Sequence, residues 1–297
     1  MKRSMQLLLA GSLGWLALGC DDPLKPVELV AEPRVLGGRV EVDGDPGRAA
    51  PAPGELATAS FLLATPELAS SLGFALAVCP GVPRRGNRPD CASAPFSEVF
   101  SANGDSDTPS IGFEVPAELD PSGRLVVLGI ICPDGTPSDD GTTCDGADPG
   151  TPIALELELA HDDDTNLNPE LLPEDITLDD DAWPELPAVD GDCAGQGFAE
   201  VAVGSKHRIG IALDEADRNP LLHPSKLDPV RESLQLSHFT TAGDLEHAFQ
   251  SIAWDSSALE REVSWTAPKE RGLVRFWLVV RDFRGGGAFT ERAVCVQ

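Results

Sequence analysis

Tyrosine is absent from this sequence of 297 residues, and basic residues are few: 22 Lys and Arg stand against 49 Asp and Glu, so that the formal net charge is −27. A surface with this excess of negative charge repels phosphates, which excludes nucleic-acid binding through a broad electrostatic face. Long uninterrupted helical stretches are also missing, because 29 Gly and 26 Pro interrupt the chain. The composition therefore weighs against helical bundles and coiled coils.

The common catalytic motifs are missing as well. The chain has no HExxH pattern, P-loop or Rossmann fingerprint, and the part after residue 19 has no GxSxG motif of serine hydrolases. Paired carboxylates are abundant, but in so acidic a chain they do not single out a glycosidase site. The sequence therefore favours a non-catalytic protein.

The N-terminus is typical of a bacterial export signal. Lys2 and Arg3 precede an apolar run from Leu7 to Leu18, which is too short to span a bilayer, and no later stretch is long enough to do so. Gly19-Cys20, followed by acidic residues, resembles the lipobox of bacterial lipoproteins. The resemblance implies a signal peptide over 1–19, lipidation of Cys20 and a tether over 20–33, with the anchor in the inner or outer membrane. An ordinary signal peptide with a chance cysteine is the alternative.

Six further cysteines form an even set, which in an exported protein predicts a disulfide framework: Cys79, Cys91, Cys132, Cys144, Cys193 and Cys295. The first four make two matching units, in each of which an apolar run ends in a cysteine followed by proline, and 11 residues separate that cysteine from the second one. We expect the local bridges Cys79–Cys91 and Cys132–Cys144, which leave Cys193–Cys295. Because no CxxC occurs and no histidine neighbours a cysteine, a zinc site is disfavoured.

Short alternating segments between turn residues predict an all-β fold. In the first half, strands are expected at Arg34–Val42, Glu55–Leu63, Leu72–Cys79, Ile111–Val115, Arg124–Cys132 and Ile153–Leu159. In the second half they are expected at Asp175–Leu178, Phe198–Val203, His207–Leu213, Ser233–Thr241, His247–Ala253, Glu262–Ala267, Leu273–Arg281 and Ala288–Val296. One short helix is expected at Thr65–Gly73. The spacing indicates two tandem β-sandwich domains, over 34–161 and 168–297, joined by an acidic linker over 162–167.

The last third carries a family resemblance. Residues 263–268 are VSWTAP, residues 272–282 are a long apolar strand that ends in Arg-Asp, and a glycine triplet follows at 285–287. These segments resemble the closing strands of bacterial Ig-like domains of the PKD or cadherin-like type, and Asn166–Pro169 resembles the entry to such domains. The resemblance implies an Ig-like fold and a likeness to bacterial surface lipoproteins, but it is nearly silent on function.

Acidity is concentrated around the expected linker. No Lys or Arg occurs between Arg124 and Lys206, and that interval holds 20 acidic residues. Oxygen-rich clusters suit Ca²⁺, a hard ion that takes 6–8 oxygen ligands, and the linker resembles that of cadherins. The candidate calcium ligands are Asp162, Asp164, Asn166 and Asn168. The alternative is a solvated linker with Asx turns.

The sequence thus predicts an exported, lipid-anchored protein of the cell envelope with a non-catalytic adhesion, scaffolding or binding role toward a protein or glycan. A calcium-stiffened surface protein and a glycan-binding or hydrolase accessory module are the alternatives. A sugar site needs exposed aromatic side chains, and Trp183, in an acidic segment flanked by proline, is the best candidate. We expect Trp254, Trp265 and Trp277 to be core or half-buried strand residues, and His207 and His238 to be surface or half-buried ones.

Overall fold

The computed structural model describes residues 25–66, 72–82, 89–101, 108–146, 150–160, 166–185, 193, 197–221 and 228–297. In these residues the protein is all-β, as the sequence predicted, with only two short 3-10 turns besides the strands. Cys20, Asp162, Asp164 and most of the expected helix at Thr65–Gly73 lie outside the described residues; Leu72 and Gly73 begin a strand. Among the described residues, no helix is long and apolar enough to cross a membrane.

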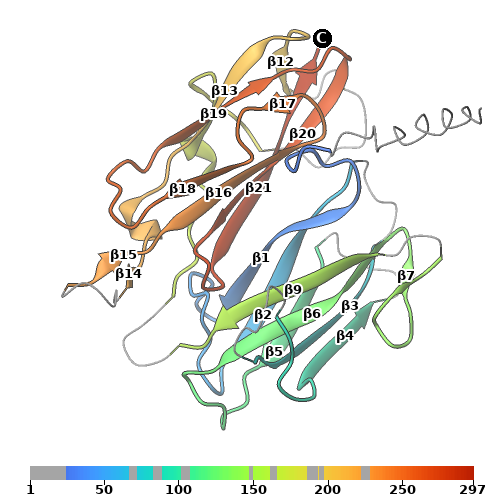
Figure 1. Ribbon diagram of the computed structural model, residues 1–297, viewed down its shortest axis with the longest axis vertical. Helices are drawn as coiled ribbons and strands as arrows, with labels where there is room; N and C mark the ends of the chain where they lie inside the picture. The colour runs from blue at the N-terminus through green and yellow to red at the C-terminus, as the bar shows by residue number, and fades with distance from the viewer. Residues whose placement is uncertain are drawn as a thin grey trace, which may run out of the picture.

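The N-terminal sandwich is built from two antiparallel sheets (Figure 1). One sheet has the order β1 (Arg34–Val42), β2 (Leu56–Ala64) and β5 (Ser110–Glu114). The other has the order β4 (Ser97–Ser101), β3 (Leu72–Pro80), β6 (Arg124–Pro133) and β9 (Thr151–Glu158). A short ladder of β7 (Thr136–Pro137) and β8 (Cys144–Asp145) lies in the loop after β6. Alternate residues of both sheets, among them Phe61, Phe74 and Phe113, fill the space between the sheets.

The C-terminal sandwich also has two sheets. The first has the order β11 (Asp181–Ala182), β10 (Ile176–Leu178), β13 (Lys206–Ile211), β19 (Arg261–Thr266) and β17 (Asp244–Leu245). The second has the order β12 (Ala199–Val201), β21 (Gly287–Val296), β20 (Gly272–Arg281), β16 (Leu234–Thr240) and β18 (Phe249–Ile252), with β12 parallel to β21. A small pair, β14 (Pro220–Leu221) and β15 (Val230–Arg231), and the 3-10 turns η1 (Pro173–Asp175) and η2 (Glu215–Asp217) lie outside these sheets.

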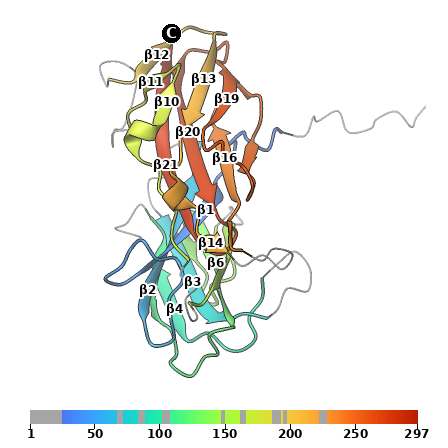
Figure 2. The same ribbon diagram turned by 90° about the vertical axis from the view of Figure 1, so that its left-hand side faces the viewer.

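Strand β20 is buried on both faces, which explains its nearly continuous apolar sequence. Its even-numbered residues from Val274 to Val280 enter the core of the C-terminal sandwich. On the other face, Trp277 and Val279 pack against Leu36 and Val30 from the start of the chain, in an apolar cluster shared by the two sandwiches. The sandwiches are stacked end to end (Figure 2), and this cluster lies between them.

The contact between the sandwiches is close at a glycine of β1. A Cβ atom at Gly37 would lie 3.1 Å from the Val279 side chain, which is tighter than ordinary van der Waals contact. Arginines of β20 close the interface with hydrogen bonds to carbonyls of the other sandwich: Arg275 donates to Thr65 O over 3.0 Å, and Arg281 donates to Leu36 O. The interface therefore combines close backbone packing with charged donors.

The end of the expected tether is part of the fold. The Val30 amide donates to Thr240 O over 2.8 Å, the Thr240 amide donates to Glu28 O over 2.9 Å, and Val30 is buried. Residues Glu28–Val30, which fall in the range 20–33 assigned to the tether, thus pair with the end of β16 before β1 begins.

The linker between the sandwiches is also held by hydrogen bonds. The Ala49 amide donates to Asn166 O over 2.8 Å, and the Asn168 amide donates to Gly47 O over 2.7 Å. The Asn168 side chain joins the two sandwiches, because its Nδ2 donates to Val40 O over 2.7 Å and its Oδ1 accepts from the Gly287 amide over 3.1 Å. Asn168 is therefore a buried clamp, which differs from the open calcium ligand expected from the sequence.

Candidate functional site

The structure contains three disulfides, and they are the pairs expected from the cysteine spacing. Cys79–Cys91 and Cys132–Cys144 each have a Cα–Cα distance of 5.6 Å, and Cys193–Cys295 has one of 5.3 Å. The first two bridges tie loops that leave the ends of the central strands β3 and β6. Because these neighbouring strands are antiparallel, with Leu72 opposite Pro133 and Pro80 opposite Leu125, the loops lie at opposite ends of the sheet.

Both disulfides lie on the same face of this sheet. The even-numbered residues of Phe74–Val78 enter the core, so the odd-numbered residues of Ala75–Cys79 face outward. In β6 the parity is reversed, and the even-numbered residues of Leu128–Cys132 face outward beside them. Each disulfide therefore stands on the outer face, one at each end. Between them, Ala75 and Ile130 are covered by packing with the Cys132–Cys144 bridge, while Ala77 and Leu128 are half-buried.

The middle of this face is the floor of a trough of about 770 Å³. Cross-strand neighbours form this floor, namely Phe100, Ala75, Ile130 and Pro152 in one row and Ala77 and Leu128 in the next. The residues from β3 in this floor are alanines, beside Ile130 and Leu128 of β6, and Phe100 on the edge strand β4 is 50% exposed. The trough therefore offers an apolar surface with an accessible aromatic ring at its edge.

One wall packs directly on the strand backbone beneath it. A Cβ atom at Gly73 would lie 2.3 Å from Gly135 O, so only glycine lets this loop approach β3 so closely. Gly141 has a φ of 65°, and a Cβ atom there would lie 3.2 Å from the Ala75 Cβ. The loop closed by Cys132–Cys144 thus reaches from the sheet end to the trough floor.

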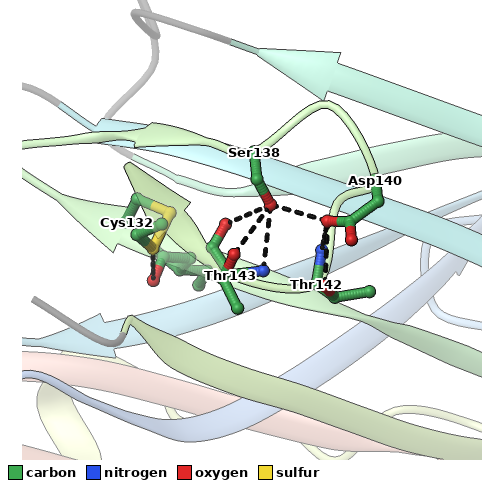
Figure 3. The surroundings of a disulfide bond; sticks show 7 residues. Cys132, Ser138, Asp140, Thr142 and Thr143 are labelled. Atoms are coloured by element: carbon green, nitrogen blue, oxygen red, sulfur yellow. Dashed lines mark hydrogen bonds between the residues drawn. A yellow bond between two sulfur atoms is a disulfide. The ribbon is translucent and has the colours of Figure 1, made fainter. Parts of the chain in front are cut away.

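Short hydrogen bonds within this wall hold its shape (Figure 3). The Asp140 carboxylate accepts hydrogen bonds from the Ser138 hydroxyl over 2.7 Å and from the Thr142 hydroxyl over 2.8 Å. The Thr143 amide donates to the Ser138 hydroxyl over 3.2 Å. The hydrogen bonds from Ser138, which is the largest cause, and from Thr142 lower the pKa of Asp140, so this carboxylate is negatively charged at neutral pH.

The rim of the trough is acidic. Asp90, Glu98, Asp139 and Asp140 line it, and the described residues that line it include no Lys, Arg or His. An apolar floor with an anionic rim suits a ligand that brings apolar and basic groups together. The two disulfide pairs could be predicted from the sequence, but the trough could not. The trough depends on the strand register of β3 and β6, which brings both disulfides onto one face and is a long-range property.

A second constellation was also missed from the sequence. The Ser205 hydroxyl lies 2.5 Å from His207 Nε2, and His207 Nδ1 lies 2.6 Å from Asp179 Oδ2. This is the order of contacts in a Ser-His-Asp triad. Burial would raise the pKa of Asp179, but hydrogen bonds from His207 and from the Arg208 amide hold it below its usual value. Asp179 is therefore an anion paired with His207.

The neighbouring backbone does not complete a hydrolase site around Ser205. Its hydroxyl also lies 2.5 Å from Ala202 O, which competes with His207 for the proton. Acyl transfer needs two free donors for the developing oxyanion, whereas the Gly204 and Ser205 amides already donate to Pro268 O and Ala202 O. The chain of contacts instead secures the β10–β11 turn, in which Asp179 and Asp180 have positive φ values of 55° and 72°.

Two aromatic expectations from the sequence are wrong. Trp183 is 1% exposed, its Nε1 donates to Ala293 O over 3.0 Å, and its ring packs edge-on against Phe276, so it offers no sugar platform. His238 is fully buried, whereas a surface or half-buried position was expected. Trp265 and Trp277 are core residues, and Trp254 is 36% exposed. Among the described residues, no three His, Cys, Asp or Glu side chains converge as metal ligands.

No protein family matches this chain, and no curated protein matches it. Solved structures with distant likeness include Escherichia coli alpha-2-macroglobulin activated by porcine elastase, at 10% identity over 89% of this chain and 22% of that one, with a TM-score of 0.26. A glycosyl hydrolase family 2 member from Bacteroides cellulosilyticus has 10% identity over 90% and 29%, with a TM-score of 0.23. The Yersinia pseudotuberculosis adhesin InvE has 10% identity over 86% and 58%, with a TM-score of 0.20. The chain thus spans between about a fifth and three fifths of these proteins' lengths, and likenesses this distant support no conclusion about this chain.

Proposed function

We propose that this protein is an exported, lipid-anchored binding protein of the cell envelope and that the trough on the N-terminal sandwich holds its partner. The observation that carries the proposal is an apolar floor with an acidic rim on one sheet face, between two disulfides at opposite ends of that face. Loops fixed on a rigid scaffold are the usual location of binding residues. The three disulfides indicate a chain that folds in an oxidising compartment, which agrees with export.

The chemistry of the trough favours a protein segment with apolar and basic side chains. Its apolar floor and Phe100 supply hydrophobic contact, and the four rim carboxylates supply complementary charge. Strand β4 lies at the edge of its sheet, so an extended segment gains backbone hydrogen bonds there as well. With Trp183 buried, the described residues of the trough hold one aromatic platform, Phe100, which makes a glycan the weaker choice.

Peptide binding tests this proposal. Extended peptides that alternate Val and Lys are compared with peptides that alternate Val and Glu by fluorescence anisotropy. We expect the basic peptides to bind more tightly, and we expect Phe100→Ala and Glu98→Lys each to weaken that binding at least tenfold. Phe249→Ala is the matched control, because Phe249 is 44% exposed on the edge strand β18 of the other sandwich. Equal binding of both peptide types, or a loss in the Phe249 variant alone, would contradict the proposal.

The lipid anchor has a separate test. Cys20→Ala removes the acylated sulfur, and the protein should then move from the membrane fraction to the soluble fraction of the producing cells. Continued association of the variant with membranes would place the anchor elsewhere.

A further inference from the structure

A cleft of about 420 Å³ lies where the two sandwiches meet. Strand β1 contributes residues 35–38 to its lining, and strand β9 contributes residues 152–156. The hairpin between β20 and β21, which reaches the N-terminal sandwich (Figure 1), contributes Phe283 and two glycines. Most of the lining is apolar. Cavities of this size at domain interfaces are a usual location of ligand sites, so the polar groups of this cleft indicate the kind of ligand.

The hairpin wall of the cleft is held in place by hydrogen bonds. Asp282 Oδ1 accepts from the Arg284 amide over 2.7 Å and from the Gly286 amide over 2.9 Å, which fixes the turn. The Arg284 carbonyl in turn accepts from the amide of Glu158, the last residue of β9, over 3.2 Å. The hairpin and β9 are therefore joined, and the cleft is formed before any ligand enters it.

Phe283 has an unfavourable conformation in this turn. Its φ of 66° is in the left-handed region, which favours glycine and asparagine over a bulky residue. Phe283 is also 70% exposed, so little packing within the chain offsets the strain. An exposed ring that is held at a strained position beside a cleft indicates contact with a molecule from outside the chain.

Arg281, the last residue of β20, supplies the cationic group of the cleft. Its Nη2 donates to Leu36 O, a carbonyl of the β1 wall. Its Nε is buried without an acceptor, whereas Nη1 has no acceptor among the described residues and is not buried. The neighbour of Arg281 on β21 is Gly287, which has no side chain to cover the guanidinium. The described lining contains no other Lys, Arg or His.

Arg281 differs from the arginines around it, because these have carboxylate partners. Arg275, on the same face of β20, pairs with Glu291 over 2.5 Å, and Arg284 of the hairpin pairs with Glu158 over 3.0 Å. The described residues give Arg281 no such ion pair. Acidic residues outnumber basic ones 49 to 22 in this chain, so a half-buried arginine without a carboxylate is an exception. Its charge is available to an anion from outside the chain.

We propose that this cleft binds a carboxylate carried by an apolar group, with the Arg281 guanidinium as its charge partner and the Phe283 ring as its apolar cover. Guanidinium groups form strong, charge-assisted hydrogen bonds with carboxylates. Glu156, the acidic residue of the described lining, pairs with Arg124 and so leaves Arg281 to the ligand. A phosphate would bring nearly two negative charges to one arginine in a chain of net charge −27, which favours the carboxylate.

Two sources carry this chemistry, a small free acid and the C-terminus of a polypeptide. The cleft adjoins the trough, because Pro89, Pro152 and Ile153 line both. A polypeptide that ends in the cleft can therefore continue across β9 into the trough. The proposal does not rest on the trough, since Arg281 and Phe283 line the cleft alone.

The test is a ligand-observed NMR titration of the full chain with N-acetylphenylalanine and with its amide, which lacks the charge. We expect a Kd of about 1 mM for the acid, typical of so small a ligand, and binding at least fivefold weaker for the amide. Arg281→Gln keeps a donor for Leu36 O and should weaken binding of the acid at least fivefold. Arg271→Gln is the matched control, because Arg271 precedes the opposite end of β20, and it should leave binding unchanged.

Phe283→Gly provides an independent measurement. Glycine adopts a φ of 66° without strain, so thermal melts should show this variant to be at least as stable as the parent. It should nevertheless bind the acid at least threefold more weakly, because the ring is gone. Phe249→Ala, at the exposed ring of β18, is its control and should bind the acid as the parent does.

A third comparison identifies the source of the carboxylate. A peptide that alternates Val and Lys and ends in phenylalanine is titrated with a free and with an amidated C-terminus. Tighter binding of the free form, lost in Arg281→Gln, would identify a chain end as the ligand. Equal binding of the two peptides, with N-acetylphenylalanine still bound, would identify a small acid.

Three results would overturn the proposal. They are equal binding of N-acetylphenylalanine and its amide, no binding of either, and binding of the acid that survives both Arg281→Gln and Phe283→Gly. If Arg281→Gln is unstable, the acid–amide comparison and Phe283→Gly still decide. Phe100→Ala, which tests the trough, should leave binding of N-acetylphenylalanine unchanged, so that failure of one site is distinguishable from failure of the other.

Discussion

His238 makes the free energy of unfolding depend on pH, so that the folded protein is less stable in acid. The side chain points from β16 into the core of the C-terminal sandwich, where Leu278 is its neighbour on β20, and neither ring nitrogen has a hydrogen-bond partner in the described structure. Burial lowers the pKa of His238 to about 4. In the unfolded chain this histidine takes up a proton near pH 6.5, whereas in the folded chain it stays neutral down to about pH 4. The free energy of unfolding therefore decreases as the pH falls from about 6.5 toward 4.

The size of the effect follows from the two pKa values. With about 6.5 in the unfolded state and about 4 in the folded state, linkage gives a loss of about 2 kcal/mol at pH 5 and about 3 kcal/mol at pH 4. Replacement of His238 by Leu removes this proton-linked loss. It also removes two buried nitrogens without partners, each of which costs about 1–3 kcal/mol, so the variant should be the more stable one even at pH 7.

Urea denaturation of both proteins at pH 7.5, 6, 5 and 4.5 measures the difference. Other acidic groups affect parent and variant alike, so the free-energy difference isolates residue 238. We expect His238→Leu to gain steadily on the parent as the pH falls. Parallel pH profiles for the two proteins would refute the reasoning, because they would mean that the histidine titrates normally in the folded state.

Three further predictions concern the stability of the folded chain and are measured by denaturation at pH 7.5. Gly37→Val should cost about 1–3 kcal/mol by overpacking against Val279, whereas Gly112→Ala, where the nearest atom lies 4.0 Å away, should cost less than 1; equal losses would contradict the close contact. Trp183→Ala should cost about 3–5 kcal/mol, as expected for a buried ring, and Trp254→Ala about 1 or less; the reverse order would place Trp183 on the surface. Cys132→Ser/Cys144→Ser should destabilise the N-terminal sandwich by about 3 kcal/mol and weaken peptide binding, and intact binding would remove this loop from the trough.

The strand positions could be predicted from the sequence because they depend on local patterns. The prediction at Arg34–Val42 coincides with β1, and that at Leu273–Arg281 differs from β20 by one residue. Strand β4 was missed, since its sequence SEVFS is short and only its odd positions meet the core. That omission hid the edge of the trough, which carries Glu98 and Phe100.

The contact between the sandwiches could not be predicted, because its signal is long-range. Arg275 and Arg281 lie on the outer face of β20, and a charged side chain in a strand usually indicates a position open to solvent. Here their guanidinium groups donate to Thr65 O and Leu36 O, carbonyls more than 200 positions earlier in the chain. The contacts that join Ser205, His207 and Asp179 could not be predicted for the same reason, because Asp179 lies 28 positions before His207 in the sequence.

The shared apolar cluster also sets an order of events during synthesis. Val30 and Leu36 leave the ribosome early, but Val279, which covers them, follows about 240 residues later. At a synthesis rate of roughly 5–20 residues per second, Leu36 on β1 stays exposed for about 12–50 s before Val279 is synthesised. During that interval the N-terminal sandwich can form its own core, but the apolar side chains of β1 that later contact β20 stay exposed to other nascent chains. A chaperone that shields β1 until β20 arrives would thus serve this protein more than one that acts on either sandwich alone.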